Sequence, residues 1–573
     1  MSKMTIHGGE HAIKRVFSDE FHFTVPLYQR AYSWTNEQSE ELLQDLLEAM
    51  DRGEEVVEEL APYFLGSIVL SKGEEPDSQI IDGQQRLTTL TMLLSALRSL
   101  SGVEYADSLT KFLCEEGNIV TSTPKRYRLR LRERDVKFFE EYIQEEGGIE
   151  KLKKIQDEPL PPSQRNIRDN TLGFLRELEN FSPDKITKLT QFIVNRCFLI
   201  IVAVSTADLD STYRVFSVLN DRGLNLSYPD ILKAKIINAV PVNLQEEYTS
   251  KWEEVESNIL EDKDAFEELC FILRAIYSRR RLRKGVLEEF HEYVYPGRTQ
   301  EYKPEQFIDT ILIPHAHALS NILKTNFQSS KYAAKAQIIN SMFKQLNQLD
   351  NQRWIAPALS YFFHNFAQPD KMLRFLNDLE RLVVSFIVCR IPPYQRIDRY
   401  CELLQAMYEG NDLYTSNSPL QLKSREREEF LKKLDGDIYQ TVPIPVCRYI
   451  LLRLDEKLSE GKASYAYETT TVEHVLPQRP SLDSEWAKTF PSREIRDKYV
   501  NRLGKLVLLS RGKNMRAENF DFITKKNQYF TTKGGISSFV LTTQVLHYQE
   551  WTPAIIEQRQ RDLIGVLRSL WAL

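Results

Sequence analysis

An acidic residue and a histidine stand side by side near the C-terminal end of the sequence. Glu473 and His474 follow a β-branched run at 469–472, which is typical of a strand. A neutral imidazole can deprotonate a water molecule, and a divalent cation held by oxygen ligands can stabilise the leaving oxygen of a phosphodiester. A Glu-His dipeptide alone would also suit a histidine that is exposed or packed in the core. The function of the pair therefore has to be inferred from the elements around it.

The next segments supply the rest of such a site. GKLVLLS at 504–510 is typical of a second strand, and RGKNMRAENFDFITKKNQYF at 511–530 supplies Asn514 on a loop that leads into a helix. We expect this unit of two strands and a helix to hydrolyse phosphodiesters. His474 would be the general base, and Glu473 and Asn514 would be the oxygen ligands of Mg²⁺ or Mn²⁺.

A second set of candidate residues lies at the start of a helix in the N-terminal part. The segment IIDGQQRLTTL at 80–90 changes from a strand-like run to helical spacing, with Asp82 and Gly83 as turn residues. A helix N-terminus that follows a glycine binds anions through its backbone N–H groups and its dipole. We therefore predict a phosphate site here. The first turn of the helix contains Gln84, Gln85 and Arg86.

A polar loop further along the chain could belong to the same site. Asn220 and Arg222 precede Gly223, which is typical of a helix end, and a new helix is expected from about Ser227. These could equally be ordinary turn residues. The sequence contains no G-x-x-x-x-G-K-[ST] segment, so any nucleotide site is not of the Walker type.

Two basic clusters could hold the phosphates of DNA, although the net charge is -6. In KRYRLRLRER at 125–134, a strand would project its arginines from one face. The second cluster is RRRLRK at 279–284. Each could instead be a solvated face with counter-charges such as Glu133. The candidate DNA-binding residues are Arg128, Arg130, Arg132, Arg279 and Arg281.

The 573 residues, 42% apolar and 27% charged, predict a globular protein of several domains. We expect an α+β fold: an α+β domain at 1–240, a helical connecting domain at 241–440 and a mixed domain at 441–573. No run is long and apolar enough for a membrane helix, and the N-terminus lacks the apolar core of a signal peptide. We therefore expect a cytoplasmic protein with no membrane partner.

The C-terminal motifs resemble those of a known family. VEHVLPQ at 472–478, Trp486, LGKLVLLS, Asn514 and the lysines at 525–526 resemble the nuclease domain of GmrSD-type modification-dependent restriction enzymes. The resemblance implies a ββα-metal finger of the HNH (His-Me finger) type. Family members usually have G-N-L where this chain has Gly504, Lys505 and Leu506. Lys505 thus stands in place of an asparagine that orients the histidine, and Asn501 is the candidate substitute.

The N-terminal motifs resemble the ParB-like domain of the same enzymes, which binds and hydrolyses a nucleoside triphosphate. They are VPLYQRAYSW at 25–34, IIDGQQRLTTL at 80–90 and VFSVLNDRGLNLSYPDILKAKI at 215–236. Both domains occur in the family's order on one chain. The resemblance implies that ATP or GTP binds at Gln29, Arg30, Asp82, Gly83, Gln84, Gln85, Arg86, Asn220 and Arg222.

The resemblance implies type IV restriction in a prokaryotic cytoplasm. The chain would cut double-stranded phage DNA that carries modified bases, under the control of nucleotide binding or hydrolysis, and we expect a homodimer. One alternative is a nucleotide-driven DNA-binding switch or regulatory subunit with an inactive nuclease domain, which Lys505 favours. A further alternative is a toxin that acts on RNA or unmodified DNA.

Overall fold

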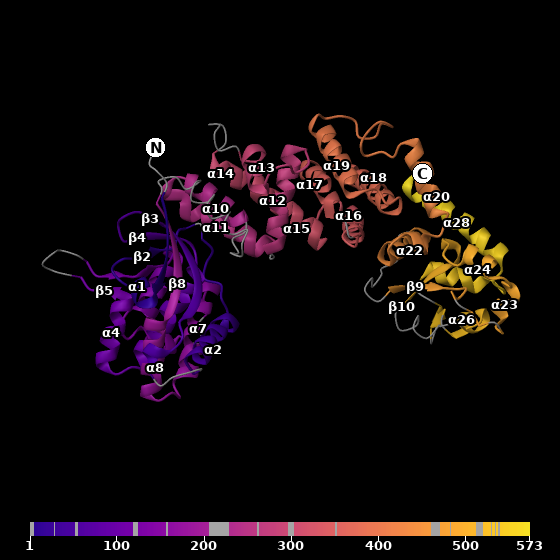
Figure 1. The fold of residues 1–573 in the computed structure, drawn as a ribbon. Helices are drawn as coiled ribbons and strands as arrows, with labels where there is room; N and C mark the ends of the chain where they lie inside the picture. Colours follow the sequence, from indigo (N-terminus) through magenta and orange to yellow (C-terminus); the bar gives the residue numbers. More distant parts are fainter. Residues whose placement is uncertain are drawn as a thin grey trace. The chain divides into compact units, whose positions relative to one another are not determined.

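The computed structural model divides the chain into two compact units, Met1–Glu253 and Glu254–Leu573 (Figure 1). Each unit has its own helices and sheets. The residues that the structure describes are 5–27, 29–51, 56–117, 124–155, 159–205, 228–260, 263–295, 303–349, 352–459, 470–478, 480–481, 483–510, 520–528, 530–532, 535–536 and 539–573.

The first unit is built on a six-stranded mixed sheet in the order β1-β8-β3-β4-β2-β7. β2 is parallel to both β4 and β7, whereas β3 is antiparallel to β4 and parallel to β8. The carboxyl ends of β2, β4 and β7 therefore meet at one edge of the sheet, where α3 begins. The strands are β1 (Thr5–Ala12), β2 (His22–Thr24), β3 (Tyr63–Lys72), β4 (Asp77–Asp82), β7 (Leu129–Arg130) and β8 (Cys197–Ser205), with a separate pair of β5 (Cys114–Glu115) and β6 (Arg126–Tyr127).

The core of this unit surrounds α3, which packs against α4, α7 and α8. Its sequence QQRLTTLTMLLSALRSL has small and apolar residues on every side, and nearly the whole helix is buried. The helices are α1 (Ile13–Val16), α2 (Asn36–Asp51), α3 (Gln84–Leu100), α4 (Val103–Leu113), α5 (Glu133–Phe139), α6 (Gly148–Lys154), α7 (Pro162–Leu178), α8 (Pro183–Arg196), α10 (Tyr228–Ala239) and α11 (Gln245–Glu254), with shorter turns at Val57–Glu59, Glu140–Gln144 and Val242–Leu244.

The second unit begins with helices, which pack on one another through apolar faces. α18 is an example, because its apolar residues recur every three or four positions and all of its core face is buried. The helices are α12 (Lys263–Ser278), α13 (Val286–Tyr293), α14 (Pro304–Phe307), α15 (Ile313–Lys324), α16 (Ala333–Leu346), α17 (Ile355–Asn365), α18 (Pro369–Val388), α19 (Pro393–Tyr408), α20 (Ser424–Leu434), α21 (Ile438–Thr441) and α22 (Ile444–Leu458), with shorter turns at Val255–Ile259, Ile308–Leu312 and Gln352–Trp354.

The C-terminal part of this unit contains a small two-stranded sheet between helices. α22 contacts β9, β10, α27 and α28, so it supports the sheet from one side. The elements are β9 (Thr470–His474), α23 (Glu485–Thr489), α24 (Arg493–Tyr499), β10 (Leu506–Ser510), α26 (Phe522–Gln528), β11 (Thr531–Thr532), β12 (Gly535–Ile536), α27 (Val540–Thr543) and α28 (Pro553–Trp571), with shorter turns at Leu503–Lys505 and Gln544–His547.

A buried ion pair joins α18 to α22, the helix that supports the small sheet. Arg453 on α22 donates two hydrogen bonds to Glu380 on α18, at 2.7 and 2.9 Å, and the Tyr449 hydroxyl donates a third at 2.7 Å. Such a group is costly to break because a charge would be left buried and unpaired. Residues 254–573 accordingly form one compact unit.

The coarse expectations from the sequence agree with this fold. The structure is mixed, with a sheet-based N-terminal unit, and the described residues between 241 and 440 contain helices and no strand. Among the described helices, none combines the length and apolar composition that crossing a membrane requires. The division into two compact units does not test the predicted domain boundary at residue 440, which stays a prediction.

Candidate functional site

The Glu473–His474 pair lies at the end of the small sheet. β9 and β10 pair antiparallel, with His474 opposite Leu506 and Glu473 opposite Val507. α26 follows, and its Lys525 side chain reaches Glu473. The predicted unit of two strands and a helix is therefore confirmed, and it brings an acidic residue, an imidazole and a lysine together.

Glu473 and Lys525 form a buried ion pair. The Lys525 Nζ donates to the Glu473 Oε1 at 2.6 Å and to the backbone oxygen of His474 at 2.8 Å. Burial raises the pKa of Glu473 and lowers the pKa of Lys525, and the attraction within the pair opposes both shifts. The pair thus fixes both the carboxylate and the end of β9. The adjacent motif lysine, Lys526, instead donates to the backbone oxygen of Tyr548 at 2.8 Å.

His474 is buried as a neutral imidazole. Its ring lies edge-on to the Tyr439 ring, with centroids 4.3 Å apart and an interplanar angle of 84°. Burial above all, and then the neighbouring Lys505 and Lys525, lowers the pKa of His474 to about 2. The backbone of Val500 approaches the ring and partly opposes this lowering of the pKa, but neither ring nitrogen forms a full hydrogen bond within the described part of the chain. The imidazole is therefore uncharged at neutral pH, and the same burial makes it a weaker base than a free histidine.

Lys505, which stands in place of the family asparagine, and Asn501, the candidate substitute, take different places. Lys505 is fully buried, and its Nζ has no hydrogen-bond partner among the described residues. Burial, reinforced by Lys525, lowers the pKa of Lys505 well below its usual range. Asn501 donates its side-chain amide to the Gln440 side chain at 3.2 Å. Lys505 therefore lies with the Glu473 group, whereas Asn501 is bound elsewhere.

A close backbone approach sets the start of β10. The Gly504 nitrogen donates to the Gln560 side chain at 2.7 Å, and a Cβ at Gly504 would lie 2.4 Å from the Ile556 backbone oxygen. A glycine is thus required where this turn meets α28. The contact holds the residue that follows, Lys505, in its buried position.

The side chains of this site can be compared with the ligands that Mg²⁺ and Mn²⁺ prefer. Glu473 offers carboxylate oxygen, which suits Mg²⁺ and Mn²⁺, and the unpartnered nitrogens of His474 suit a base that meets a water molecule. Within the described ranges, no three His, Cys, Asp or Glu side chains are grouped to hold a metal ion. The predicted ligand Asn514 lies outside the described residues. Glu473 thus supplies one carboxylate for a metal, and its Oε1 accepts from Lys525 in this structure.

The predicted phosphate site lies at the edge of the large sheet. β4 ends at Asp82, Gly83 has a φ of +93°, and α3 begins at Gln84. The predicted strand, turn and helix are therefore confirmed. A Cβ at Gly83 would lie 2.3 Å from the Ile68 side chain, so the turn requires glycine both for its backbone angle and for space. Burial raises the pKa of Asp82.

Two of the predicted glutamines hold the preceding loop in place. Gln85 accepts from the backbone nitrogens of Ser33 and Trp34, at 2.8 and 3.2 Å. Gln29 donates to the Ile81 backbone oxygen at 2.7 Å. These contacts bring the segments around 25–34 and 80–86 together, as a shared site requires.

The remaining predicted side chains of this site differ in burial and in hydrogen bonding. Arg86 donates to the Ser67 backbone oxygen at 2.9 Å and is partly buried. Gln84 is buried, and its Oε1 has no partner among the described residues. Arg30 is exposed. The other two predicted residues, Asn220 and Arg222, lie outside the described residues.

Arg132 joins this edge of the sheet, although its sequence pattern placed it with the DNA-binding candidates. It is buried, donates to the Gln29 backbone oxygen at 3.1 Å and pairs with Glu253. Lys233 on α10 also pairs with Glu253, at 3.3 Å. The sequence interpretation missed Lys233 and Glu253. A lysine inside the apolar run ILKAKI was the signal for the first.

The other basic candidates differ in exposure. The segment 125–134 forms two short strands in separate sheets, so its arginines do not share one exposed face. Arg128 is buried and pairs with Asp19 at 2.6 Å, whereas Arg130 is exposed and pairs with Glu133. Arg279 lies over the Tyr408 ring, and Arg281 pairs with Asp398.

Comparison with known proteins finds a family model for each end of the chain. The model of the GmrSD restriction endonuclease N-terminal domain matches residues 13–237, and the model of the GmrSD restriction endonuclease C-terminal domain matches residues 424–566. The two matches together cover more than half of the chain. The chain belongs to the GmrSD restriction endonuclease family.

Each of the two candidate sites lies within a different GmrSD match. The N-terminal GmrSD domain contains the turn at 82–86 and Arg132, and the C-terminal GmrSD domain contains β9, β10 and α26. The helices between 238 and 423 lie outside both matches. A relative of the chain is an uncharacterized protein of Methanocaldococcus jannaschii, 24% identical over 268 residues. The match covers 43% of this chain and 43% of that protein, less than half of the length of either.

Replacement of Lys525 by alanine is expected to destabilise the C-terminal GmrSD domain. The Glu473 carboxylate would be left buried without its partner, which costs roughly 3–5 kcal/mol. Lys526→Ala is the matched control, because it removes one hydrogen bond to a backbone oxygen, worth about 1 kcal/mol. Urea unfolding followed by tryptophan fluorescence measures both changes. Equal losses of unfolding free energy in the two variants would contradict the pairing.

Proposed function

We propose that this chain is a metal-dependent DNA endonuclease that cuts modified double-stranded DNA and is regulated by a nucleoside triphosphate. It would act in type IV restriction against phage in a prokaryotic cytoplasm. The observation that carries the proposal is the geometry of His474. The imidazole is neutral, ends a strand beside Glu473 and belongs to a two-strand-plus-helix unit within the C-terminal GmrSD domain.

The residues of this unit would have different roles in hydrolysis. His474 accepts a proton from the attacking water, because it is the imidazole placed beside Glu473 at the end of β9. Tyr439 and the buried surroundings hold the ring in one orientation. Lys525 orients the Glu473 carboxylate and anchors the backbone of His474. Mg²⁺ or Mn²⁺, when bound through Glu473 and Asn514, supplies stabilisation of the charge on the leaving oxygen.

The nucleotide would bind at the edge of the large sheet. The N-terminus of α3 offers backbone N–H groups and the positive end of the helix dipole to a phosphate group. Arg30 and Arg86 add positive charge, and Gln84 has an unpaired oxygen that is able to accept a hydrogen bond. ATP and GTP both carry the phosphates that this arrangement fits. We extend the proposal to hydrolysis of the nucleotide, which the family resemblance implies.

Arg30→Ala is expected to weaken the binding of ATP or GTP by roughly 10- to 150-fold, because one charge-assisted hydrogen bond is worth roughly 1.5–3 kcal/mol. Arg134→Ala is the control, since Arg134 is also exposed in the same unit but does not belong to the turn. Isothermal titration calorimetry of the full chain gives both dissociation constants. Unchanged binding in Arg30→Ala would remove Arg30 from the site.

The metal requirement has a direct test. Supercoiled plasmid that carries modified bases is incubated with the chain in Mg²⁺, Mn²⁺ or a chelator, and conversion to nicked or linear DNA is measured. We expect conversion in the metals and none in the chelator. Cutting that persists in the chelator would contradict a metal-dependent mechanism. The ratio of nicked to linear product, measured with the mass of the chain in solution, also tests whether a homodimer cuts both strands.

A second candidate function is a nucleotide-driven DNA-binding switch with an inactive nuclease domain. Two observations favour it: the buried amine of Lys505 and the engagement of Glu473 by Lys525. This candidate predicts nucleotide-dependent DNA binding with no cutting in any metal. The Lys505→Asn variant then separates the two candidates. If the nuclease domain is inactive, the unsubstituted chain should not cut and Lys505→Asn should cut. If the nuclease domain is active, the unsubstituted chain should already cut.

A further inference from the structure

The three N-terminal motif segments are joined by one group of charged side chains. Gln29 of the first segment donates to the backbone oxygen of Ile81, in the second segment, at 2.7 Å. Arg132 donates to the backbone oxygen of Gln29 at 3.1 Å and pairs with Glu253. Lys233, from the described part of the third segment, also pairs with Glu253, at 3.3 Å. Glu253 therefore connects the third segment to the turn where the nucleotide would bind.

This group is nearly closed to solvent. The side chains of Arg132 and Lys233 are 5% and 2% exposed, and those of Asp135 and Glu253 are 3% and 21% exposed. The Arg132 Nη2 lies 3.8 Å from the Asp135 Oδ2, and Asp135 accepts a hydrogen bond from the Ser163 hydroxyl at 2.8 Å. Two cations and two anions therefore balance one another in a place that water hardly reaches.

The Glu253 carboxylate supports the buried guanidinium of Arg132. Burial opposes its ionisation, but Lys233 and then Arg132 lower the pKa of Glu253 below its usual value, so the carboxylate is charged at neutral pH. In the described part of the chain, the Nε and Nη2 of Arg132 have no hydrogen-bond partner. Loss of the Glu253 charge would therefore leave Arg132 short of both counter-charge and hydrogen-bond acceptors.

Glu253 also has a distinctive position in the chain. It lies near the end of α11 and is the last residue of the first unit. The second unit begins at the next residue, and the turn Val255–Ile259 follows α11 directly. A contact that holds Glu253 therefore holds the point at which the chain leaves the first unit.

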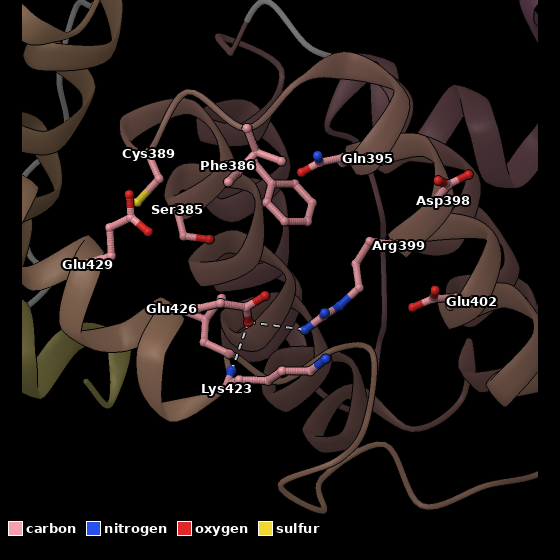
Figure 2. A pocket seen from close by; sticks show the side chains of 12 residues that line it. Ser385, Phe386, Cys389, Gln395, Asp398, Arg399, Glu402, Lys423, Glu426 and Glu429 are labelled. Atoms are coloured by element: carbon pink, nitrogen blue, oxygen red, sulfur yellow. Dashed lines mark hydrogen bonds and ion pairs between the residues drawn. The ribbon is translucent and has the colours of Figure 1, made fainter.

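A pocket of the second unit also contains charged side chains, but its arginine is well supplied with partners. Figure 2 shows this pocket, in which Arg399 lies 3.4 Å from Glu426. Arg399 also donates to the backbone oxygens of Pro419 and Gln421, at 2.6 Å each. Among the residues that line this pocket, all of which the structure describes, no buried side-chain atom lacks a hydrogen-bond partner. The group around Arg132 differs, because buried donors of its guanidinium remain unpaired.

We propose that Glu253 is a positioning residue that couples the nucleotide site to α11. Through Arg132 it holds the backbone of Gln29, and the next residue is Arg30, the exposed arginine that we expect to meet the phosphates. Nucleotide binding in return stabilises this pairing and so fixes the end of α11. The inference rests on the proposed function, because it states how the nucleotide site acts on the segment that enters the second unit.

The two effects are linked in size. If release of α11 from this pairing weakens nucleotide binding by a given factor, saturating nucleotide makes the release rarer by the same factor. Couplings between two sites are typically about 5- to 150-fold. The path runs through Arg132 and a backbone contact of Gln29. Glu253 thus acts on the nucleotide indirectly, and we expect a factor of about ten.

Hydrogen exchange of the full chain measures this coupling without DNA and without cutting. Calorimetric titration with the β,γ-imido analogues of ATP and GTP, which resist hydrolysis, first identifies the nucleotide that binds. Exchange of the α11 amides is then followed by mass spectrometry with and without that analogue. In the unsubstituted chain we expect saturating analogue to slow this exchange by about tenfold.

Glu253→Gln removes the charge and keeps nearly the same size. We expect the dissociation constant of the analogue to rise by about tenfold, and the slowing of α11 exchange at saturation to disappear. Glu247→Gln is the matched control, because Glu247 is exposed on the same helix and pairs with Lys251 of α11 itself. It should behave like the unsubstituted chain.

A double variant covers the case in which Glu253→Gln does not fold. Glu253→Gln with Lys233→Met removes one buried charge of each sign, so Arg132 and Asp135 remain as a balanced pair. The slowing of α11 exchange should be lost here as well. A double variant that shows the same slowing as the unsubstituted chain would overturn the role of Glu253, and so would equal effects of Glu253→Gln and Glu247→Gln.

The results also separate the coupling from the function on which it rests. Binding of an analogue to the unsubstituted chain with no change in α11 exchange would overturn the coupling and leave the nucleotide site in place. No binding of either analogue would contradict the nucleotide site, and the coupling with it. Slower exchange with the analogue, lost in the Glu253 variants and kept in Glu247→Gln, is the result that the proposal predicts.

Discussion

DNA cleavage is expected to fall by about 10²–10⁴-fold in His474→Ala. The imidazole ends β9 beside Glu473, where it is the group placed to accept a proton from water. Its removal leaves Glu473 and Lys525 in place, and their ion pair should keep the fold intact. Single-turnover strand scission in Mg²⁺ measures the rate of the cutting step, and a gel-shift assay shows that DNA binding persists.

A matched histidine provides the control for this result. His547 is exposed in the same C-terminal part and lies outside the Glu473 group. His547→Ala should cut at the rate of the unsubstituted chain. If His474→Ala cuts at that rate as well, His474 is not the general base, and the proposed role of the two-strand-plus-helix unit is wrong.

Gly83→Ala is expected to destabilise the first unit by roughly 2–5 kcal/mol. A left-handed backbone costs alanine about 1–2 kcal/mol, and a forced steric contact adds about 1–3 kcal/mol. Both apply here, because φ is +93° and the new Cβ would lie 2.3 Å from Ile68. The turn also presents the N-terminus of α3, so binding of ATP or GTP should be lost with it.

Gly73→Ala serves as the comparison, because a Cβ there would meet no atom within 4 Å. It should leave unfolding and nucleotide binding unchanged. Urea unfolding of the full chain, with calorimetric titration of nucleotide, measures both quantities. Nucleotide binding that survives in a folded Gly83→Ala chain would contradict the placement of the phosphate site at this turn.

The local elements around both sites could be predicted from the sequence. The β-branched run before Glu473 and the apolar run after Gly504 each form a strand, and the helix that contains Lys525 follows them. The Asp82–Gly83 turn lies between a strand and a helix as expected. These features depend on residues close together in the chain, where apolar spacing and turn residues are informative.

Long-range contacts could not be predicted in the same way. The pairing of Lys525 with Glu473 joins two different elements, and the basic character of Arg132 gave no sign that Glu253 and Gln29 would bury it. The pairing of β1 with β8 joins segments that are far apart in the chain, with Thr5 opposite Ser205. Periodicity shows which face of a strand or helix is apolar, but it does not identify the partner that covers that face.

The central claim is that one chain cuts modified DNA under the control of a nucleotide. The most direct test compares natively modified with unmodified phage DNA, in Mg²⁺, with and without ATP or GTP, for the unsubstituted chain and His474→Ala. We predict cutting of the modified DNA alone, a rate that changes with nucleotide, and no cutting by His474→Ala. If no metal or nucleotide gives cutting above the His474→Ala background on any DNA, the endonuclease proposal is contradicted and the binding-switch candidate takes its place.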